Sequence, residues 1–314
     1  MFRNEVADFV TDIVGPPTDL AAVHVRAWSS VWRAETEMGI WFVKENCPEQ
    51  DHEAELLLTL EDIAPGRVVP VLATQGAMFL MPDLGSPLGE SVGDDLAAWC
   101  RVVVAAAELQ VAVAPHVDRL GLVSLPPSEA PGLVTAAIDR LGILAGDDPR
   151  RLGDEDAARL RTLMPTVERW AEQVAALDLP LTLVHNDLHA HNVFEVDGRI
   201  RLFDLGDAVA MEPLAGLLVP LNVLAHHLEA GPDDPRLWRV ADAALEVWSD
   251  VAPIAELRDV LPVALQLGRL GRVESWERVS RSMNPAELAE YGDAAAYWLG
   301  SLALDPPLGH LTSE

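Results

Sequence analysis

The stretch LVHNDLHAHNVF, residues 183–194, decides the fold, because it places three histidines, one aspartate and two asparagines in eight positions between apolar runs. The flanking segments LTLV and NVFEV have the pattern of short strands. His185, Asp187, His189 and His191 are residue types that bind zinc or iron. However, His185 and His189 share a face only on a helix, whereas His189 and His191 share one only on a strand. A metal hydrolase therefore stays an alternative hypothesis.

The spacing of the acidic and amide residues favours a catalytic loop. Asn192 follows Asp187 by five positions, and Asp204 comes twelve positions later in IRLFDLGDA, where an apolar strand ends and a turn begins. This H-x-D-L-x-x-x-N arrangement, followed by D-L-G, parallels a phosphoryl-transfer pattern. In that pattern one Asp receives the hydroxyl proton, and an Asn and a second Asp hold magnesium. The intervening strand, turn and strand are expected to return Asp204 to the first loop.

Lysine is almost absent from the sequence. The 22 basic residues are 21 arginines and a single lysine, Lys44. A lysine supplies a compact ammonium that acts as a point charge on phosphate, which arginine does not replace. Lys44 lies at the end of GIWFVKE, residues 39–45, on the same strand face as Ile40 and Phe42. The alternative is that one lysine survives by chance in a lysine-poor composition.

The next segment offers a partner for this lysine. EQDHEAELLLTLED, residues 49–62, is expected to form a helix in which Glu53, Leu57 and Leu60 lie on one apolar stripe. Glu55 falls on the solvated face. A carboxylate on the buried stripe needs a cation, because burying an unpaired charge is costly. The pattern predicts a Lys44–Glu53 pair, unless the helix register differs and Glu53 is exposed.

The order of elements predicts an α+β chain with two lobes. Strands are expected at residues 23–28, 30–37, 39–45, 67–76 and 77–89, and helices at 49–62, 94–114, 132–146, 154–177 and again after about residue 210. We expect a small antiparallel-sheet lobe, residues 1–82, and a larger, mostly helical lobe, residues 83–314. A chain of this length commonly divides in this way.

Composition limits the possible partners. The net charge of −28 argues against nucleic acid, whose phosphates are bound mainly by lysine and arginine, and suits a cationic ligand. Cys47 and Cys100 lie too far apart for a metal-type motif or a disulfide framework. The N-terminus lacks the pattern of a signal peptide, and the longest apolar runs are too short or too interrupted to cross a bilayer. We therefore expect a cytoplasmic protein without a nucleic-acid or membrane partner.

Taken together, the motifs resemble the aminoglycoside phosphotransferase and choline kinase family of kinase-like enzymes. The resemblance extends from about Trp28 to Trp298 and is carried by HNDLHAHN, FDLGDA and, upstream, VK and EAELLLTL. It implies a protein-kinase-like fold and Mg²⁺-dependent transfer of the γ-phosphate of ATP, or GTP, to a hydroxyl of a small molecule. The residue roles that it implies are Lys44 on the nucleotide phosphates, Glu53 positioning Lys44, Asp187 as catalytic base or hydroxyl-orienting group, and Asn192 and Asp204 as magnesium ligands.

Other positions follow from the same resemblance. FLMPDLG, residues 79–85, resembles an inter-lobe hinge, so the backbone of Met81, Asp83 and Leu84 is expected to meet adenine. No glycine-rich loop is present, and Ser29 and Ser30 stand there as candidate phosphate contacts. His185 resembles the histidine that braces the catalytic loop. Two departures leave the catalytic charges intact: Asn186 replaces a common glycine, and Leu205 stands where many relatives have an aromatic residue. Three other polar residues belong to this region. His189 and Asp207 are candidates for the substrate site, Asp207 also for a contact to magnesium, and His191 is expected to be a loop residue. For each of the three, a structural role is the alternative.

The acceptor is the least determined part. In the family the acceptor pocket is built by C-terminal helices, and the candidates here are Glu274, Trp276, Glu277, Asp293, Tyr297 and Trp298. The aromatic candidates have an alternative role in the core. The acidic composition and the family favour a cationic, polyhydroxylated acceptor of the aminoglycoside type, as in antibiotic resistance. The alternatives are a metabolic kinase for an amino alcohol or sugar, such as choline, ethanolamine, homoserine or an amino sugar, and a nucleotide-binding protein without turnover.

Overall fold

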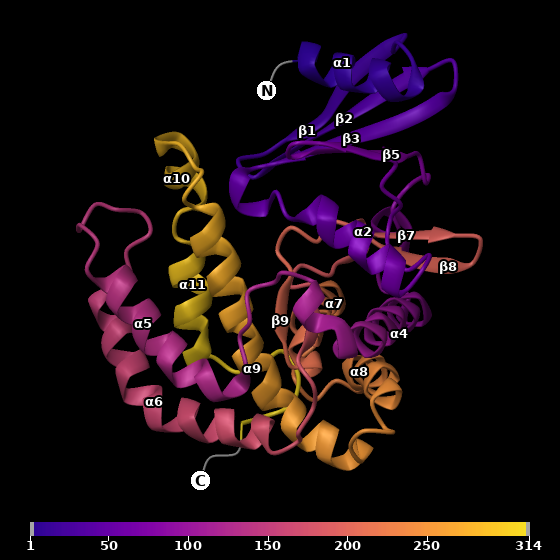
Figure 1. Ribbon diagram of the computed structural model, residues 1–314. Helices are drawn as coiled ribbons and strands as arrows, with labels where there is room; N and C mark the ends of the chain where they lie inside the picture. The colour runs from indigo at the N-terminus through magenta and orange to yellow at the C-terminus, as the bar shows by residue number, and fades with distance from the viewer. Residues whose placement is uncertain (1–2, 312–314) are drawn as a thin grey trace.

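The computed structural model describes residues 3–311 and has two lobes (Figure 1). The N-terminal lobe is an antiparallel sheet of five strands in the order β1-β2-β3-β5-β4. Helix α1 covers one face and α2 the other, which faces the helical lobe (Figure 1). The elements of this lobe are α1 (Arg3–Val14), β1 (Asp19–Val25), β2 (Ser29–Thr36), β3 (Gly39–Asn46), α2 (Glu53–Ile63), β4 (Ala73–Gln75) and β5 (Met78–Pro82).

Most of the predicted N-terminal elements are present, although β1 lies earlier than the strand predicted over residues 23–28 and the strand predicted over residues 77–89 ends at Pro82. Two larger differences occur. The strand predicted over residues 67–76 is wrong in its first part, where Val68 forms only an isolated bridge to Leu202. Pro70 has no N–H to donate to a ladder, and this segment instead bonds to the end of β8 in the other lobe. Helix α1, whose Val6, Phe9 and Val10 pack on the sheet, was not predicted.

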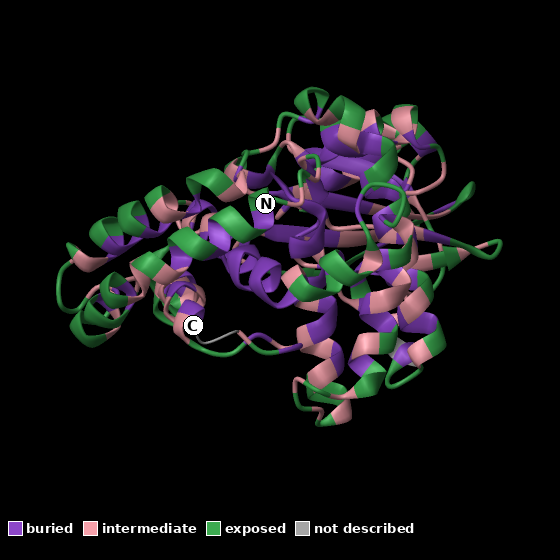
Figure 2. Cartoon of the chain, turned by 90° about the horizontal axis from the view of Figure 1, so that it is seen from below, coloured by how far each residue is buried: buried purple, intermediate pink, exposed green. Residues whose placement is uncertain are grey.

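The C-terminal lobe is built of helices around two short β-ladders, β6 with β9 and β7 with β8. Helix α9 has 26 residues, roughly 39 Å of helix, and most of it is buried. Figure 2 shows the buried residues gathered between the helices and the exposed ones on their outer sides. The elements are α3 (Gly89–Val92), α4 (Leu96–Val113), α5 (Ala130–Gly142), α6 (Asp154–Ala175), β6 (Thr182–Val184), β7 (Val193–Val196), β8 (Arg199–Leu202), β9 (Val209–Met211), α7 (Leu218–Leu228), α8 (Pro235–Val247), α9 (Ile254–Val279), α10 (Pro285–Tyr291) and α11 (Ala294–Gly300).

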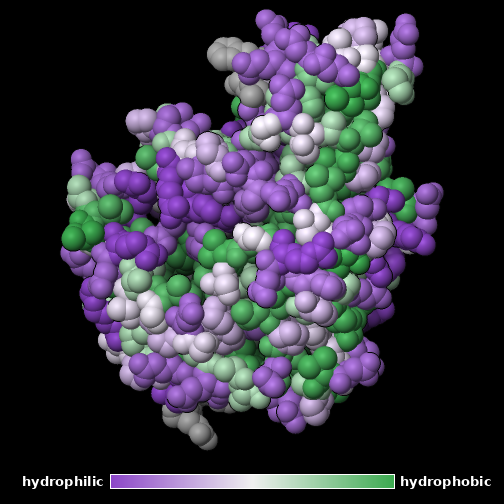
Figure 3. All heavy atoms as spheres, viewed as in Figure 1, coloured by the Kyte–Doolittle hydropathy of each residue, from purple (hydrophilic) through white to green (hydrophobic). Residues whose placement is uncertain are grey.

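One helical stretch, Leu96–Arg119, is long and apolar enough to cross a membrane by length and composition. It contains α4, which packs against α8 inside the helical lobe, and half of its most apolar window is buried. A core helix passes the same test, so this stretch is weak evidence for a membrane span. On the face shown in Figure 3, hydrophilic side chains prevail over the helical lobe.

The segment between β3 and α2 joins the two lobes. Glu49 accepts a hydrogen bond from Ser282, which follows α9, and Gln50 donates to Asp207 at 2.6 Å. His52, the residue before α2, lies near Arg278 of α9. Burial and then the charge of Arg278 lower the pKa of His52 to about 4. His52 is therefore neutral in the folded protein at pH values where an unfolded histidine is already protonated.

This difference predicts a stability that depends on pH. The contribution of neutral His52 is fully present above pH 6.5 and is lost as the pH falls through the range from 6.5 to about 4. We expect His52→Asn to reduce the loss of unfolding free energy between pH 7 and pH 4.5 by on the order of 1 to 3 kcal/mol, measured by urea denaturation. His116→Asn, at an exposed histidine, is the control. Parallel pH profiles for wild type and His52→Asn would contradict the expectation.

Candidate active site

The buried ammonium of Lys44 connects three separate segments. Its Nζ lies 2.5 Å from Oε2 of Glu53, the first residue of α2, and contacts Oδ1 of Asp204, which follows β8. Lys44 is 1% exposed and Glu53 is fully buried. Burial alone would lower the pKa of Lys44, but the carboxylates of Asp204 and Glu53 hold it above its usual value. The Lys44–Glu53 pair predicted from the helix register is present, and Lys44 is a fixed positive charge.

Glu53 also holds the turn that contains Asp204. Its Oε1 accepts the backbone N–H of Leu205 at 2.9 Å, and its Oε2 accepts Asn46 Nδ2 at 2.7 Å. A buried carboxylate with several donors is compensated for its lost hydration. The backbone of Asp204 is in the left-handed conformation, with φ of 62°. Its carboxylate lies beside Lys44.

The catalytic-loop candidate, residues 185–192, is held to the strand before Asp204. Asp187 N–H donates to His185 Nδ1 at 3.3 Å, so the ring carries its proton on Nε2, which donates to the Phe203 carbonyl at 2.8 Å. Asn186 has φ of 66°, a conformation that glycine and asparagine tolerate best. This backbone suits asparagine as well as glycine, the residue that the resemblance led us to expect at this position.

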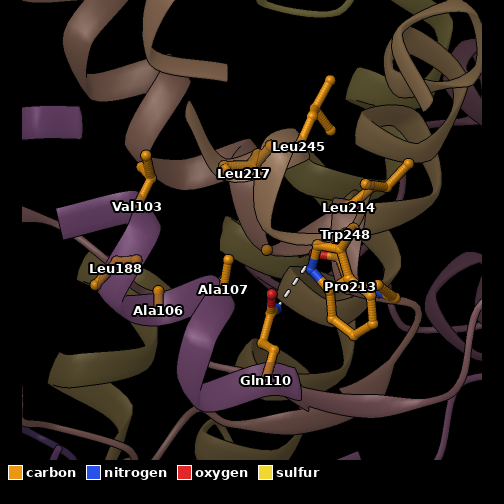
Figure 4. A pocket seen from close by; sticks show the side chains of 12 residues that line it. Val103, Ala106, Ala107, Gln110, Leu188, Pro213, Leu214, Leu217, Leu245 and Trp248 are labelled. Atoms are coloured by element: carbon orange, nitrogen blue, oxygen red, sulfur yellow. Dashed lines mark hydrogen bonds between the residues drawn. The ribbon is translucent and has the colours of Figure 1, made fainter. Parts of the chain in front are cut away.

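Leu188 anchors the loop in the core. Its side chain is buried and borders a cavity of about 20 Å³ between α4 and the residues that precede α7 (Figure 4). Figure 4 shows Gln110 of α4 on the same wall, where its amide donates to the Pro213 carbonyl at 3.2 Å. Apolar packing around Leu188 thus fixes the backbone between Asp187 and His189.

A larger cavity of about 610 Å³ lies between the lobes, within the size range of small-molecule sites. Several residues predicted from the sequence border it: Ser29, Met81, Leu84, Asp187, His189, His191, Asn192 and Asp204. His24 and Arg26 of the β1 edge also border it and were not predicted. Ser30 and Asp83 are not among the bordering residues; Ser30 Oγ accepts from Trp32 Nε1, and the Asp83 carboxylate accepts from Gly85 N.

The oxygen groups in this cavity suit a magnesium ion. Asp204 offers a carboxylate, and Asn192 donates its amide nitrogen to the Asp187 carbonyl at 3.0 Å, which leaves its amide oxygen for a cation. Carboxylate and amide oxygens are the ligands that Mg²⁺ prefers. Among the side chains that the structure describes, those of residues 3–89 and 92–311, no three from His, Cys, Asp or Glu are grouped to hold a metal. The histidine cluster therefore gives no support to the metal-hydrolase hypothesis.

Arg272 of α9 contacts Asp187 from below the loop and was missed by the sequence analysis. Its Nη1 lies 3.2 Å from Asp187 Oδ1 and 3.1 Å from Asp207 Oδ2, and it donates to the Asn186 carbonyl at 2.8 Å. Burial alone would raise the pKa of Asp187, but the charge of Arg272 and a hydrogen bond from His189 hold it below its usual range. Asp187 is therefore an ionised carboxylate, fixed in direction by Arg272.

Gly271 lets α9 approach the loop this closely, because a Cβ there would lie 2.8 Å from Asn186 Oδ1. Gly268 does the same for the segment before α7, where a Cβ would lie 3.1 Å from the Ala215 carbonyl. Asn186 Nδ2 donates to the Gly271 carbonyl at 2.7 Å. The polar residues within the apolar run LQLGRLGRV were the only trace of this contact in the sequence.

The other polar residues of the loop are already engaged. Asp207 accepts from Gln50 on one oxygen and from Arg272 on the other. Burial, opposed by Arg272, raises the pKa of Asp207 to about 6. His189 Nε2 lies 3.4 Å from Asp187 Oδ2 and 3.3 Å from Asn192 Nδ2. His191 packs on Gly89, where a Cβ would overlap its ring.

The structure divides the acceptor candidates between two faces of α9. Trp276 lies one turn after Arg272 and borders a small cavity that reaches Asp187. Trp298 lies over the Arg272 guanidinium at 5.5 Å. Glu274 and Glu277 face the opposite side, where they border a separate cavity, and Glu277 is paired with Arg140 at 2.6 Å. Of the other two candidates, Asp293 directly precedes α11 and Tyr297 is 65% exposed.

No protein-family model matches the sequence, and no curated protein matches it significantly. Solved structures do match. A choline/ethanolamine kinase family protein from Mesorhizobium loti has a TM-score of 0.63 at 14% identity, with 98% of this chain and 96% of that chain covered. A thermostable mutant of an aminoglycoside phosphotransferase has 0.57 at 16%, covering 95% and 98%. An amicoumacin kinase in complex with AMP-PNP, Ca²⁺ and Ami has 0.56 at 15%, covering 99% and 96%. The chain has their fold, as the resemblance predicted.

The Lys44–Glu53 pair gives a prediction about stability. We expect Lys44→Met to lower the unfolding free energy by about 3–5 kcal/mol, because it leaves Glu53 buried without a cation. Lys44→Met combined with Glu53→Gln should recover part of that loss, since no buried charge remains. Arg33→Met, at a half-buried cation of the same sheet, is the control and should cost about 1 kcal/mol or less. Denaturation curves for wild type, Lys44→Met, Glu53→Gln and the double variant measure the coupling, and additive effects would contradict it.

Proposed function

We propose that this chain is a magnesium-dependent small-molecule kinase that transfers the γ-phosphate of ATP, or GTP, to a hydroxyl group. One observation carries the proposal: Asp187 and Asn192 of one loop and Asp204 of the turn after β8 border one cavity between the lobes, and Lys44 is paired with Asp204 at its wall. The shared fold with small-molecule kinases supports it. A nucleotide-binding protein without turnover would not need Asp187 to be fixed and ionised.

The roles follow from charge and position. Lys44 supplies a fixed cation for the nucleotide phosphates, and Glu53 keeps it in place. Asn192 and Asp204 hold Mg²⁺, which when bound neutralises charge on the phosphates. The hinge backbone around Met81 and Leu84 borders the cavity where adenine would bind. AMP-PNP and Ca²⁺ in the amicoumacin kinase support a nucleotide and a divalent cation in this fold.

Asp187 acts on the acceptor. Its carboxylate orients the acceptor hydroxyl for in-line attack on the γ-phosphorus. As the new P–O bond forms, the bond to the nucleoside diphosphate breaks, and the hydroxyl proton passes to Asp187. The pKa of Asp187 is held low by Arg272, so Asp187 is a weak base that accepts the proton late and contributes mainly by orientation. His185 keeps the loop in place and does not border the nucleotide cavity.

The acceptor in this proposal is a cationic, polyhydroxylated small molecule. The net charge of −28 favours a cation in solution, and the solved structures with this fold include an aminoglycoside phosphotransferase and a choline/ethanolamine kinase family protein. A metabolic kinase for an amino alcohol or sugar is the alternative. The identity of the acceptor decides between an antibiotic-modifying role and a metabolic one. ATP and magnesium are abundant in the cytoplasm, where we place the reaction. The proposal includes no nucleic-acid partner and no membrane partner.

Acceptor-dependent release of nucleoside diphosphate tests the proposal. Mg²⁺ with ATP or GTP would be combined with pools of aminoglycosides, other hydroxylated antibiotics, amino alcohols and sugars. We expect one pool to stimulate release, Asp187→Asn to reduce it by roughly 10²- to 10⁴-fold while nucleotide still binds, and Asp204→Asn to weaken nucleotide binding in Mg²⁺. Asp197→Asn, in the exposed β7–β8 turn, is the matched control and should behave as wild type.

Two results would count against this function. Release that persists at the wild-type rate in Asp187→Asn would remove the assigned role of that residue. Nucleotide binding without release in any pool would favour a nucleotide-binding protein without turnover.

A further inference from the structure

A second, smaller cavity meets the nucleotide cavity at Asp187. It has about 50 Å³ and is bordered by Trp28, Asp187, Asp207, Arg272, Ser275, Trp276 and Val279. Among the residues that border the two cavities, Trp28 and Asp187 are the ones that belong to both. In-line transfer puts nucleotide and acceptor on two sides of the catalytic carboxylate. The smaller cavity therefore has the position of an acceptor site.

Trp28 forms the wall of this cavity that comes from the N-terminal lobe. It lies in the turn between β1 and β2, where Cys47 N donates to its carbonyl at 2.7 Å. Its ring packs edge-on against Trp276 of α9 at 5.5 Å and against Tyr291 of α10 at 5.3 Å. The indole thus spans from the nucleotide lobe to the helices that border the acceptor side.

The size of the cavity shows that the wall must open. About 50 Å³ is room for a few water molecules, whereas sites for small molecules have roughly 300–1,000 Å³. Of the other walls, Arg272 is paired with two carboxylates, Ser275 and Val279 are buried in α9, and Trp276 stacks on Tyr291 from within the same helix α9. Trp28 is on a turn and makes aromatic contacts that a ligand can replace. We therefore expect Trp28 to move more easily than the other residues that border the cavity.

We propose, resting on the phosphotransferase function above, that Trp28 closes the acceptor side of the catalytic site and limits the size of the acceptor. In the closed position the indole separates the small cavity beside Asp187 from bulk water, and an acceptor enters by displacing the indole. Ser29, the next residue, borders the nucleotide cavity, so displacement of Trp28 also reaches the nucleotide. Acceptors with a hydroxyl on a narrow arm need little displacement, and wider ones need the ring to leave.

Hydrolysis of ATP without an acceptor measures the closure. When the wall is open, water attacks the γ-phosphorus, the bond to ADP breaks, and the proton passes to Asp187, giving inorganic phosphate. We expect Trp28→Ala to release phosphate several-fold faster than wild type, Trp28→Phe to stay near wild type, and Trp28→Ala with Asp187→Asn to lose the gain. Unchanged hydrolysis in Trp28→Ala, with nucleotide binding intact, would overturn the proposal.

A second measurement does not depend on turnover. Ser275 is 1% exposed and borders the small cavity, so its replacement by cysteine places a thiol behind Trp28. We expect Ser275→Cys to react slowly with iodoacetamide, and Ser275→Cys with Trp28→Ala to react at least several-fold faster, with labelling of Cys100 as the internal reference. Equal rates at position 275 would overturn the closure even if no acceptor is ever phosphorylated. Faster labelling without phosphotransfer to any acceptor would sustain the closure and refute the kinase function.

Discussion

The buried ammonium of Lys44 is the interaction on which the site depends. It comes from β3 and meets a carboxylate of α2 and one from the turn after β8. Removing a charge from water is costly unless partners of opposite charge compensate it. Because Lys44 is buried, its contacts with the two carboxylates hold these three segments together. Glu53 extends the constraint by accepting the N–H of Leu205, the residue after Asp204. The two ion pairs of Lys44 thereby fix the N-terminal sheet, its helix and the turn of Asp204 in the other lobe in a single geometry.

A second constraint acts on the catalytic loop from the helical lobe. Arg272 binds Asp187, Asp207 and the backbone of Asn186, while the glycine at 271 allows α9 to come close enough to Asn186. Asp207 in turn accepts from Gln50 of the N-terminal lobe. The two lobes are therefore linked through the same carboxylates that surround the reacting groups. A substitution of Arg272 in α9 therefore acts on Asp187 through a direct contact.

Local patterns predicted what depends on neighbours in sequence. The strand face of Lys44 and the helix stripe of Glu53 follow from periodicity, and so the pair could be inferred without a structure. Arg272 could not, because it lies 85 positions after Asp187 and nothing within α9 identifies the carboxylates it meets. The strand expected from residue 67 failed because Pro70 interrupts the ladder and the segment pairs with the other lobe. Asn186 looked like a departure from the expected glycine, but its positive φ is one that asparagine tolerates.

The distribution of charge near Asp187 changes how the acceptor should be understood. The net charge of −28 is a property of the whole chain and acts on a cationic ligand at long range. Next to the reacting carboxylate, however, Asp187 and Asp207 share the guanidinium of Arg272, so the small cavity offers a cation no unpaired carboxylate among its bordering residues. A cationic acceptor must place its charge farther out, and only its hydroxyl enters beside Asp187. Selection at that point is therefore made by shape, and the shape is set by the indole of Trp28.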